Sequence, residues 1–130
     1  MVRVAALQFG SGPDVERNLE TCLRMIDRAA RDDRAGLLVL PEFCNHISWY
    51  DDQAHAQRVA LRLGDDFLTA IAERAREHGA HVVINVSLWN EGDRLTISSL
   101  LYGPEGELEG RADKQTLMGH ENQFFSPAQA

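Results

Sequence analysis

Three charged residues, Glu42, Lys114 and Glu121, stand where a folded chain could use them in chemistry. Glu42 follows Pro41 directly after the apolar run of residues 37–40, and α/β proteins usually place their sites at such strand ends. A carboxylate there can accept a proton, and an ammonium group can stabilise an oxyanion. Each residue taken alone is equally an ordinary solvated charge, so their meaning depends on the combination.

Lys114 is the only lysine in the sequence, and the rest of the 13 basic residues are arginines. A codon bias toward arginine explains the general pattern. Under that bias, the one lysine marks a position where a compact ammonium group is needed, since a planar guanidinium does not replace it in every setting. This observation favours a functional interpretation of Lys114 over that of a surface cation.

Composition limits the possible function classes. The chain has 130 residues and a net charge of −7 without a basic stripe, which argues against nucleic acid as a partner. No apolar stretch is long enough to span a membrane and the N-terminus has no signal region, so we expect a cytoplasmic protein that does not bind membranes. Cys22 and Cys44 fit neither a disulfide framework nor a zinc site, so we expect no metal and no cofactor.

The apolar pattern predicts one α/β domain over residues 1–130, with a mixed sheet. A helix begins after Asp14, and another begins after Asp65 or Asp66 and ends at Gly79. The first strand is expected to be mostly buried and the second buried on both faces. After the second strand, residues 43–63 form a long connection with helical character over 54–63. The predicted strands are residues 2–9, 37–40, 81–88, 95–102 and 107–112.

Several short motifs occur in a definite order along the chain. They are Leu-Val-Leu-Pro-Glu-Phe at 38–43, Pro-Glu-Gly at 104–106, Lys-x-x-Leu at 114–117 and Glu-x-x-x-Phe-x-Pro at 121–127. Gln8 at the end of the first strand and Asn18 at the start of the first helix add to them. Each match is weak, but together the sequence resembles the carbon–nitrogen hydrolase family, the nitrilase superfamily.

The resemblance implies a fold and an activity. The fold would be half of a four-layer α-β-β-α sandwich, with helices on one face of the sheet. The family cleaves non-peptide carbon–nitrogen bonds of small amides or nitriles with a Glu-Lys-Cys triad. Carried over by position, Glu42 would be the general base, Lys114 the cation and Glu121 an assisting glutamate. His46, Trp49 and Tyr50 could line a wall of the substrate pocket, and Tyr50 is our candidate binding residue.

The sequence departs from the family pattern at four positions. Ala112 and Asp113 replace an aromatic residue and an arginine before the lysine, so a carboxylate is expected to hold the proton on the neighbouring ammonium. Ile97 stands where an asparagine is common, and Asn85 where a glycine is usual. These changes bear on activity and on substrate range.

The catalytic cysteine of the family falls beyond residue 130. Cys22 lies on the apolar side of a predicted helix, and Cys44 is close to Glu42 but is expected to point elsewhere. We therefore interpret the chain as an N-terminal half that is inactive alone. An uncovered sheet face would associate with a complementary C-terminal half or with another copy in a homo-oligomer.

Two other functions fit part of the pattern. An inactive relative could survive as a binding or oligomerisation module, and lack of labelling by an electrophilic amide analogue would favour it. A metal-dependent phosphodiesterase shares the four-layer sandwich and could use Glu42 as a magnesium ligand. Stabilisation by magnesium would favour that alternative.

Overall fold

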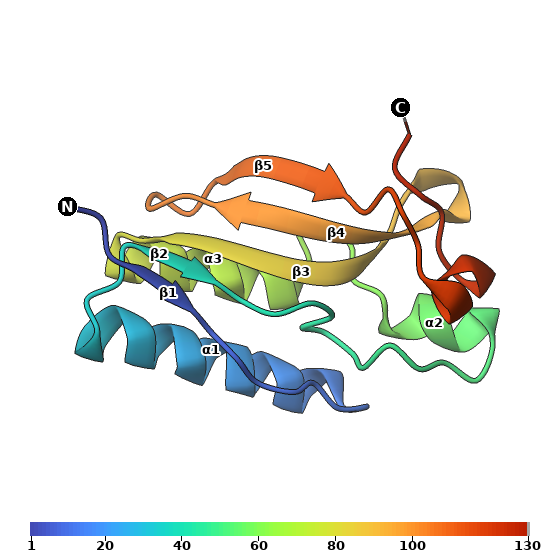
Figure 1. Ribbon diagram of the computed structural model, residues 1–130, viewed down its shortest axis with the longest axis horizontal. Coiled ribbons are helices and arrows are strands. Elements are labelled where there is room, and N and C mark those ends of the chain that lie inside the picture. Colours follow the sequence, from blue (N-terminus) through green and yellow to red (C-terminus); the bar gives the residue numbers. More distant parts are fainter. Residues whose placement is uncertain (130) are drawn as a thin grey trace.

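The computed structural model describes residues 1–129 and shows an α/β fold, confirming the predicted fold class (Figure 1). The helix α2 (Gln53–Val59) lies in the long connection, where helical character is expected over 54–63, and two 3₁₀ helices, η1 (Glu91–Asp93) and η2 (Gly119–Gln123), are added near the strand ends. The strands are β1 (Val4–Ala6), β2 (Leu37–Val39), β3 (His81–Trp89), β4 (Leu95–Tyr102) and β5 (Leu108–Asp113), and the helices are α1 (Val15–Asp32), α2 (Gln53–Val59), α3 (Asp66–His78), η1 (Glu91–Asp93) and η2 (Gly119–Gln123).

The described strands form one mixed sheet in the order β1-β2-β3-β4-β5. β1, β2 and β3 run parallel, with Leu38 beside Val82, whereas β3, β4 and β5 form an antiparallel meander. The parallel part follows from the helical crossovers between its strands, and the meander follows from the short turns after Trp89 and Tyr102. As a result, β2, β3 and β5 run in the same direction, toward the end of the molecule where α2 lies (Figure 1).

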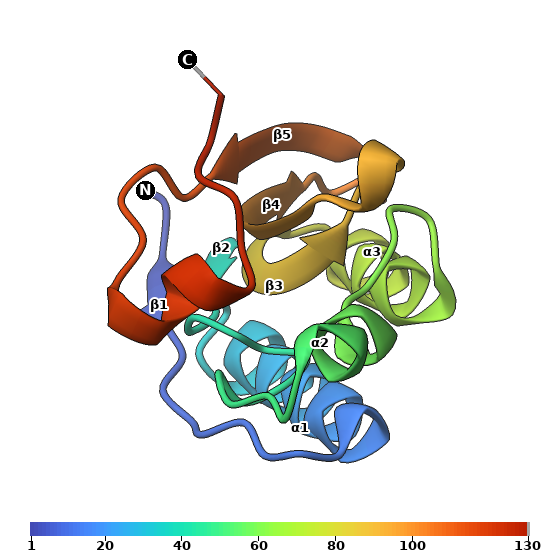
Figure 2. The ribbon, with the colours of Figure 1, turned by 90° about the vertical axis from the view of Figure 1, so that its right-hand side faces the viewer.

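Helices α1 and α3 cover one face of the sheet, as Figures 1 and 2 show from two directions. Asp14 caps α1 by accepting from the Arg17 N–H, and Asp65 caps α3 by accepting from the Leu68 N–H. α3 ends at Gly79, whose φ of +60° is the left-handed conformation that glycine often adopts at a helix C-terminus. The core between these helices and the sheet includes Cys22, Ile26, Leu38, Leu68, Ile71, Val82, Ile84, Val86 and Leu100.

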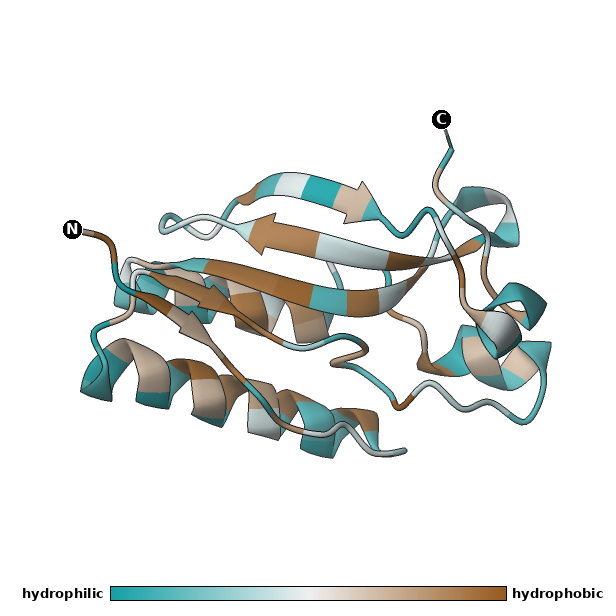
Figure 3. Ribbon diagram, in the orientation of Figure 1, coloured by the Kyte–Doolittle hydropathy of each residue, from teal (hydrophilic) through white to brown (hydrophobic). Residues whose placement is uncertain are grey.

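The opposite face of the sheet is only partly covered. Val4 is 61% exposed and Val39 36% exposed, although β1 and β2 are largely hydrophobic (Figure 3). The expectations that the first strand is mostly buried and the second buried on both faces are therefore wrong. The reason is that both helices pack on one side, and β1 is also a short edge strand with a single partner. We call this face, marked by Val4, Val39, Val83 and Leu101, the open face.

Two loop segments cover one end of the open face. The chain after β2 forms α2 and then leaves the helical conformation at Ala60, so that Leu61 pairs with Leu88 as an isolated bridge. The expected helical character up to residue 63 is thus wrong beyond Val59. The chain after β5 crosses the same end of the sheet, where the Ser126 N–H donates to the Leu95 carbonyl. Both segments contribute to a second apolar cluster, Phe43, Tyr50, Ala56, Leu95, Ile97 and Phe125.

None of the helices within residues 1–129 combines the length and the apolar character needed to cross a membrane.

Candidate active site

The structure brings Glu42, Lys114 and Glu121 together at the end of the sheet. Glu42 follows β2, Lys114 follows β5 and Glu121 lies in η2, which crosses that end in Figure 2. The Lys114 Nζ donates to Glu42 Oε1 at 2.8 Å. It also lies 3.1 Å from one carboxylate oxygen of Glu121 and 3.3 Å from the other. Glu42 and Glu121, which lie far apart in the sequence, thus share one ammonium group.

The three side chains differ in exposure. Glu42 is the most open, with 49% of its side chain exposed, while Lys114 is 26% exposed and Glu121 only 5%. The hydrogen bond from Lys114 to Glu42 raises the pKa of the Lys114 ammonium above its ordinary value, partial burial opposes this, and the contact with Glu121 adds to it. The cluster is therefore a stable cation between two carboxylates, with one carboxylate open to an incoming group.

Glu42 is placed by the way β2 ends. The Leu40 N–H still donates to the Val83 carbonyl, but Pro41 has no N–H to continue the ladder. Phe43 then adopts a φ of +57°, which reverses the chain. The ring of Phe43 is buried next to Phe125, with ring centroids 6.0 Å apart. This turn leaves Glu42 pointing out over the open face.

Lys114 is placed by two main-chain hydrogen bonds. Its N–H donates to the Ile97 carbonyl at 2.8 Å, and its carbonyl accepts from the Ala128 N–H at 2.9 Å. Ile97 is fully packed into the second apolar cluster. Lys114 is therefore held between β4 and the returning chain, and its side chain is directed to the site.

Asp113 does not touch the ammonium of Lys114, which corrects the sequence-based expectation. Successive residues of a strand point to opposite faces, so Asp113 and Lys114 lie on opposite sides of the sheet. Asp113 accepts from the Ser98 hydroxyl at 2.7 Å and from Arg111 Nε at 2.8 Å. Burial favours the neutral acid, but the hydrogen bonds from Arg111 and Ser98 outweigh it and lower the pKa of Asp113. The negative charge of Asp113 is thus balanced by Arg111 on its own side of the sheet.

The hydrogen-bonded Asp113 carboxylate makes the free energy of unfolding depend on pH in the acid range. Because the folded-state pKa of Asp113 lies below its usual 3.8, its contribution is complete above that value and is lost as pH falls through the folded pKa. We expect Asp113→Asn to lower the free energy of unfolding by about 1–2 kcal/mol at neutral pH. The deficit should shrink in strong acid, as measured by urea unfolding across pH. Asp33→Asn, an exposed position, is the control and should show no such change.

Glu121 is a buried carboxylate with a structural partner of its own. Its Oε1 accepts from the Met118 N–H at 2.7 Å, which closes the first turn of η2. Its carbonyl accepts from the Phe125 N–H at 2.9 Å, and Phe125 is buried in the second apolar cluster. Glu121 therefore joins the ammonium of Lys114 to the segment that closes this end of the sheet.

Tyr50 is buried beside the site rather than open to solvent. Its ring stacks on His46, with centroids 5.5 Å apart, and meets the edges of Phe124 and Phe125. Burial raises the pKa of the Tyr50 hydroxyl, and the nearby Ser87 opposes this in part. The hydroxyl makes no hydrogen bond of good geometry within residues 1–129, and neither does His46 Nε2. Trp49, in contrast, is exposed.

A buried polar network holds the loop that carries these residues. The Asn18 amide donates to the Asn45 carbonyl at 2.8 Å, and the Asn45 amide donates to the Ser87 hydroxyl at 2.8 Å. Asn45 also accepts from the Ser87 N–H, and it is completely buried. Sequence reasoning missed Asn45 and Ser87. Ser87 is one of several polar residues in β3, beside His81 and Asn85, so its residue type alone does not single it out.

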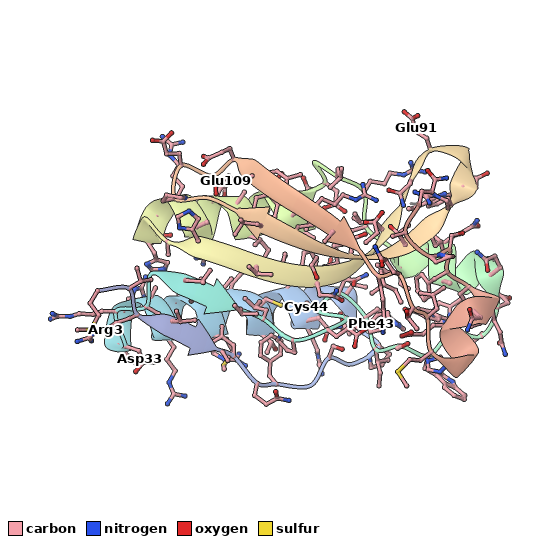
Figure 4. All side chains as sticks on the ribbon, turned by 45° about the horizontal axis from the view of Figure 1, so that its top comes forward. Arg3, Asp33, Phe43, Cys44, Glu91 and Glu109 are labelled. Carbon is pink, nitrogen blue, oxygen red and sulfur yellow. The ribbon has the colours of Figure 1, made fainter. Side chains whose placement is uncertain are left out.

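Neither cysteine is suited to be a nucleophile. Cys22 and Cys44 are both free and buried between the sheet and α1, away from the open face. Figure 4 shows Cys44 beside Phe43 in the turn after β2. Cys44 Sγ donates to the Pro41 carbonyl, and hydrogen bonding with Cys22, together with burial, raises the pKa of the Cys44 thiol far above its usual range. The thiolate form of Cys44 is therefore strongly disfavoured.

Residues 1–129 contain no group of three or more His, Cys, Asp or Glu side chains placed to hold a metal ion.

The family described as carbon-nitrogen hydrolase matches residues 3–129. The fold superimposes on Saccharomyces cerevisiae Nit3, a member of branch 10 of the nitrilase superfamily, with a TM-score of 0.86 and 22% identity, over 99% of this chain and 49% of that one. An amidase from Nesterenkonia sp. gives a TM-score of 0.84 and 22% identity, over 99% and 49%.

A mutant of the Nesterenkonia sp. AN1 amidase also matches, with a TM-score of 0.79 and 20% identity, over 100% of this chain and 51% of that one. That structure shows Michael addition of acrylamide at the active-site cysteine of the amidase. No curated protein matches the chain. The chain thus spans about half the length of these structures and has the fold of that half, which confirms the architecture expected from the resemblance.

Proposed function

Because the chain belongs to the carbon–nitrogen hydrolase family, we propose that it supplies the base and the cation of a thiol-dependent amide hydrolase. The observation that carries the proposal is the contact of Lys114 with both Glu42 and Glu121 at the end of the sheet. One carboxylate is open and the other is buried, so the two have different chemical environments. The open carboxylate of Glu42 can then serve as the proton acceptor, and the buried carboxylate of Glu121 can hold Lys114 in place.

In the proposed reaction, Glu42 takes the proton of a thiol, and the thiolate attacks the amide carbon. The new C–S bond pushes the carbonyl electrons onto oxygen, and the Lys114 ammonium stabilises the resulting oxyanion. The intermediate collapses as Glu42 returns the proton to the nitrogen, the C–N bond breaks and ammonia leaves. Glu42 then accepts a proton from water, whose oxygen attacks the thioester carbon. The C–S bond breaks, the acid leaves, and Glu42 returns the proton to the departing thiolate. Glu121 keeps Lys114 in place throughout.

The thiol in this proposal comes from polypeptide outside residues 1–130. Cys22 and Cys44 face the core between the sheet and α1, and the thiol of Cys44 resists ionisation. An active-site cysteine is present in the Nesterenkonia amidase, and this chain matches 51% of the length of that protein. The cytoplasm is the proposed location, because free thiols persist in a reducing compartment.

The substrate is proposed to be a small amide or nitrile that enters over the open face beside Tyr50. The ring of Tyr50 lies against Phe124 and Phe125, close to the buried Glu121. Its hydroxyl is buried and has no hydrogen-bond partner among residues 1–129, so a small shift of the loop would let it hydrogen-bond a polar group of the substrate. We therefore keep Tyr50 as the proposed substrate-binding residue.

The open face supports association as part of the same function. A hydrophobic sheet face with exposed Val4 and Val39 is costly in water, and the thiol must approach Glu42 from that side. A complementary C-terminal half would meet both needs, and a second copy of this chain would meet only the first. If association were the only role, the chain would be a binding or oligomerisation module without hydrolase activity.

The test is to isolate the complete assembly through an affinity tag placed on the genomic copy, and to assay it for ammonia release from small amides. We expect release of ammonia, together with co-isolation of a polypeptide segment that carries a cysteine beyond residue 130. An assembly that contains only copies of residues 1–130 and releases no ammonia would favour the module.

A further inference from the structure

The turn that carries Glu42 is held by a single residue of the neighbouring strand, Asn85. The side-chain Oδ1 of Asn85 accepts from the Phe43 N–H at 3.0 Å. Its main-chain carbonyl accepts from the Cys44 N–H at 2.8 Å. The two amide groups directly after Glu42 are therefore both bound by one residue, through a side chain in one case and the backbone in the other.

The turn needs such support because its conformation is unfavourable. Phe43 has a φ of +57°, a left-handed conformation that residues with a Cβ rarely adopt. Pro41 provides no N–H that could fasten the turn from the other side. The Asn85 side chain satisfies the Phe43 N–H in this conformation, and the buried Phe43 ring anchors the same residue against Phe125.

The orientation of the Asn85 amide is fixed as well. Its Nδ2 donates to the Ser99 hydroxyl at 3.1 Å, across the pair that Asn85 and Ser99 form between β3 and β4. With the amide nitrogen directed to Ser99, the amide oxygen faces Phe43. The sheet thus determines the direction of the Phe43 N–H. Through that N–H, it also determines the direction in which the Glu42 side chain extends from the backbone.

We infer that Asn85 is a positioning residue that holds the Glu42 carboxylate against the Lys114 ammonium through the left-handed turn at Phe43. The inference deepens the proposed hydrolase function and rests on it for the effect on catalysis. The placement of Glu42 can be measured separately, because it needs no substrate. Asn85 itself makes no contact with Lys114 or Glu121 in the hydrogen bonds of residues 1–129.

The test uses the fact that Lys114 is the only lysine, so labelling lysine with ¹³C at Cε gives one resonance that reports the titration of this ammonium. In the 130-residue chain, Glu42→Gln should lower the pKa of Lys114, and Asn85→Ala should lower it by a comparable amount. Hydrogen exchange of the Phe43 amide should become about tenfold faster, as expected for the loss of one hydrogen bond. Asn85→Asp keeps an acceptor oxygen and should restore the slow exchange of the Phe43 amide.

Asn90→Ala is the matched control, because Asn90 directly follows β3 and, like Asn85, binds main-chain and side-chain groups, but away from the site. It should leave the Lys114 resonance unchanged even if it lowers stability. In the isolated assembly, Asn85→Ala should lower kcat/KM roughly 10- to 100-fold, mainly through kcat, since the base is misplaced.

An unchanged Lys114 titration and Phe43 exchange in folded Asn85→Ala would overturn the inference. If Glu42→Gln abolishes hydrolysis while Asn85→Ala has full activity, the inference is wrong and the proposed function stands. If the wild-type assembly does not hydrolyse amides, the proposed function is wrong, and the resonance and the exchange rate still decide whether Asn85 positions Glu42.

Discussion

Replacing Lys114 with arginine or Glu42 with glutamine should nearly abolish ammonia release by the complete assembly. Glu42→Gln removes the proton acceptor while keeping the side-chain shape, and we expect a loss of about 10³-fold in kcat. Lys114→Arg keeps the positive charge but replaces a compact ammonium, held at 2.8 Å from Glu42, with a larger planar group. We expect a loss of roughly 10²- to 10³-fold, since the oxyanion then lacks its properly placed donor.

Two exposed positions on α1 provide matched controls for these changes. Glu20→Gln makes the same chemical change as Glu42→Gln, and Arg24→Lys exchanges the same two cations on the surface. Both should leave kcat and KM unchanged. Full activity in folded Lys114→Arg and Glu42→Gln assemblies would remove both residues from the proposed mechanism.

Changes at Glu121 should affect both stability and catalysis. Glu121→Ala removes a buried carboxylate that accepts from the partly buried Met118 N–H, and we expect a loss of about 2 kcal/mol in the free energy of unfolding. Glu121→Gln keeps an oxygen for Met118 and should cost clearly less stability. It still removes the charge beside Lys114, so we expect kcat to fall roughly 100-fold.

Urea unfolding and the ammonia assay separate the two effects of Glu121. Glu20→Gln again serves as the exposed control. If Glu121→Gln has wild-type activity, Glu121 supports only the local structure of η2. If Glu121→Ala is as stable as the wild type, the hydrogen bond to Met118 has no structural importance.

The start of α1 and the end of α3 could be predicted from the sequence because local chemistry determines them, whereas the end of α2 at Val59 could not. Asp14 accepts an N–H of the first turn of α1, and Gly79 adopts the left-handed conformation that ends α3. The burial of β1 and β2 was predicted wrongly for a physical reason. An apolar strand pattern shows that a face can be buried, but it does not show whether a second layer is present to bury it.

The site could be predicted only in part. The motifs indicated that Glu42, Lys114 and Glu121 belong together, and their contacts agree with that expectation. The role of Asn85 could not be predicted, because it depends on the left-handed turn at Phe43, which no residue preference indicates. Asp113 was misjudged because adjacency in sequence was taken for adjacency in space, whereas strand alternation separates it from Lys114.

The most direct test of the account is to treat the isolated assembly with acrylamide and to locate the modified thiol by peptide mass mapping. We predict modification of one cysteine outside residues 1–130, at a rate that drops when Glu42 is replaced with glutamine, with Cys22 and Cys44 unmodified until the protein is unfolded. Modification of Cys44 in the folded protein, or of no cysteine at all, would contradict the claim that Glu42 and Lys114 serve a thiol supplied from beyond these residues.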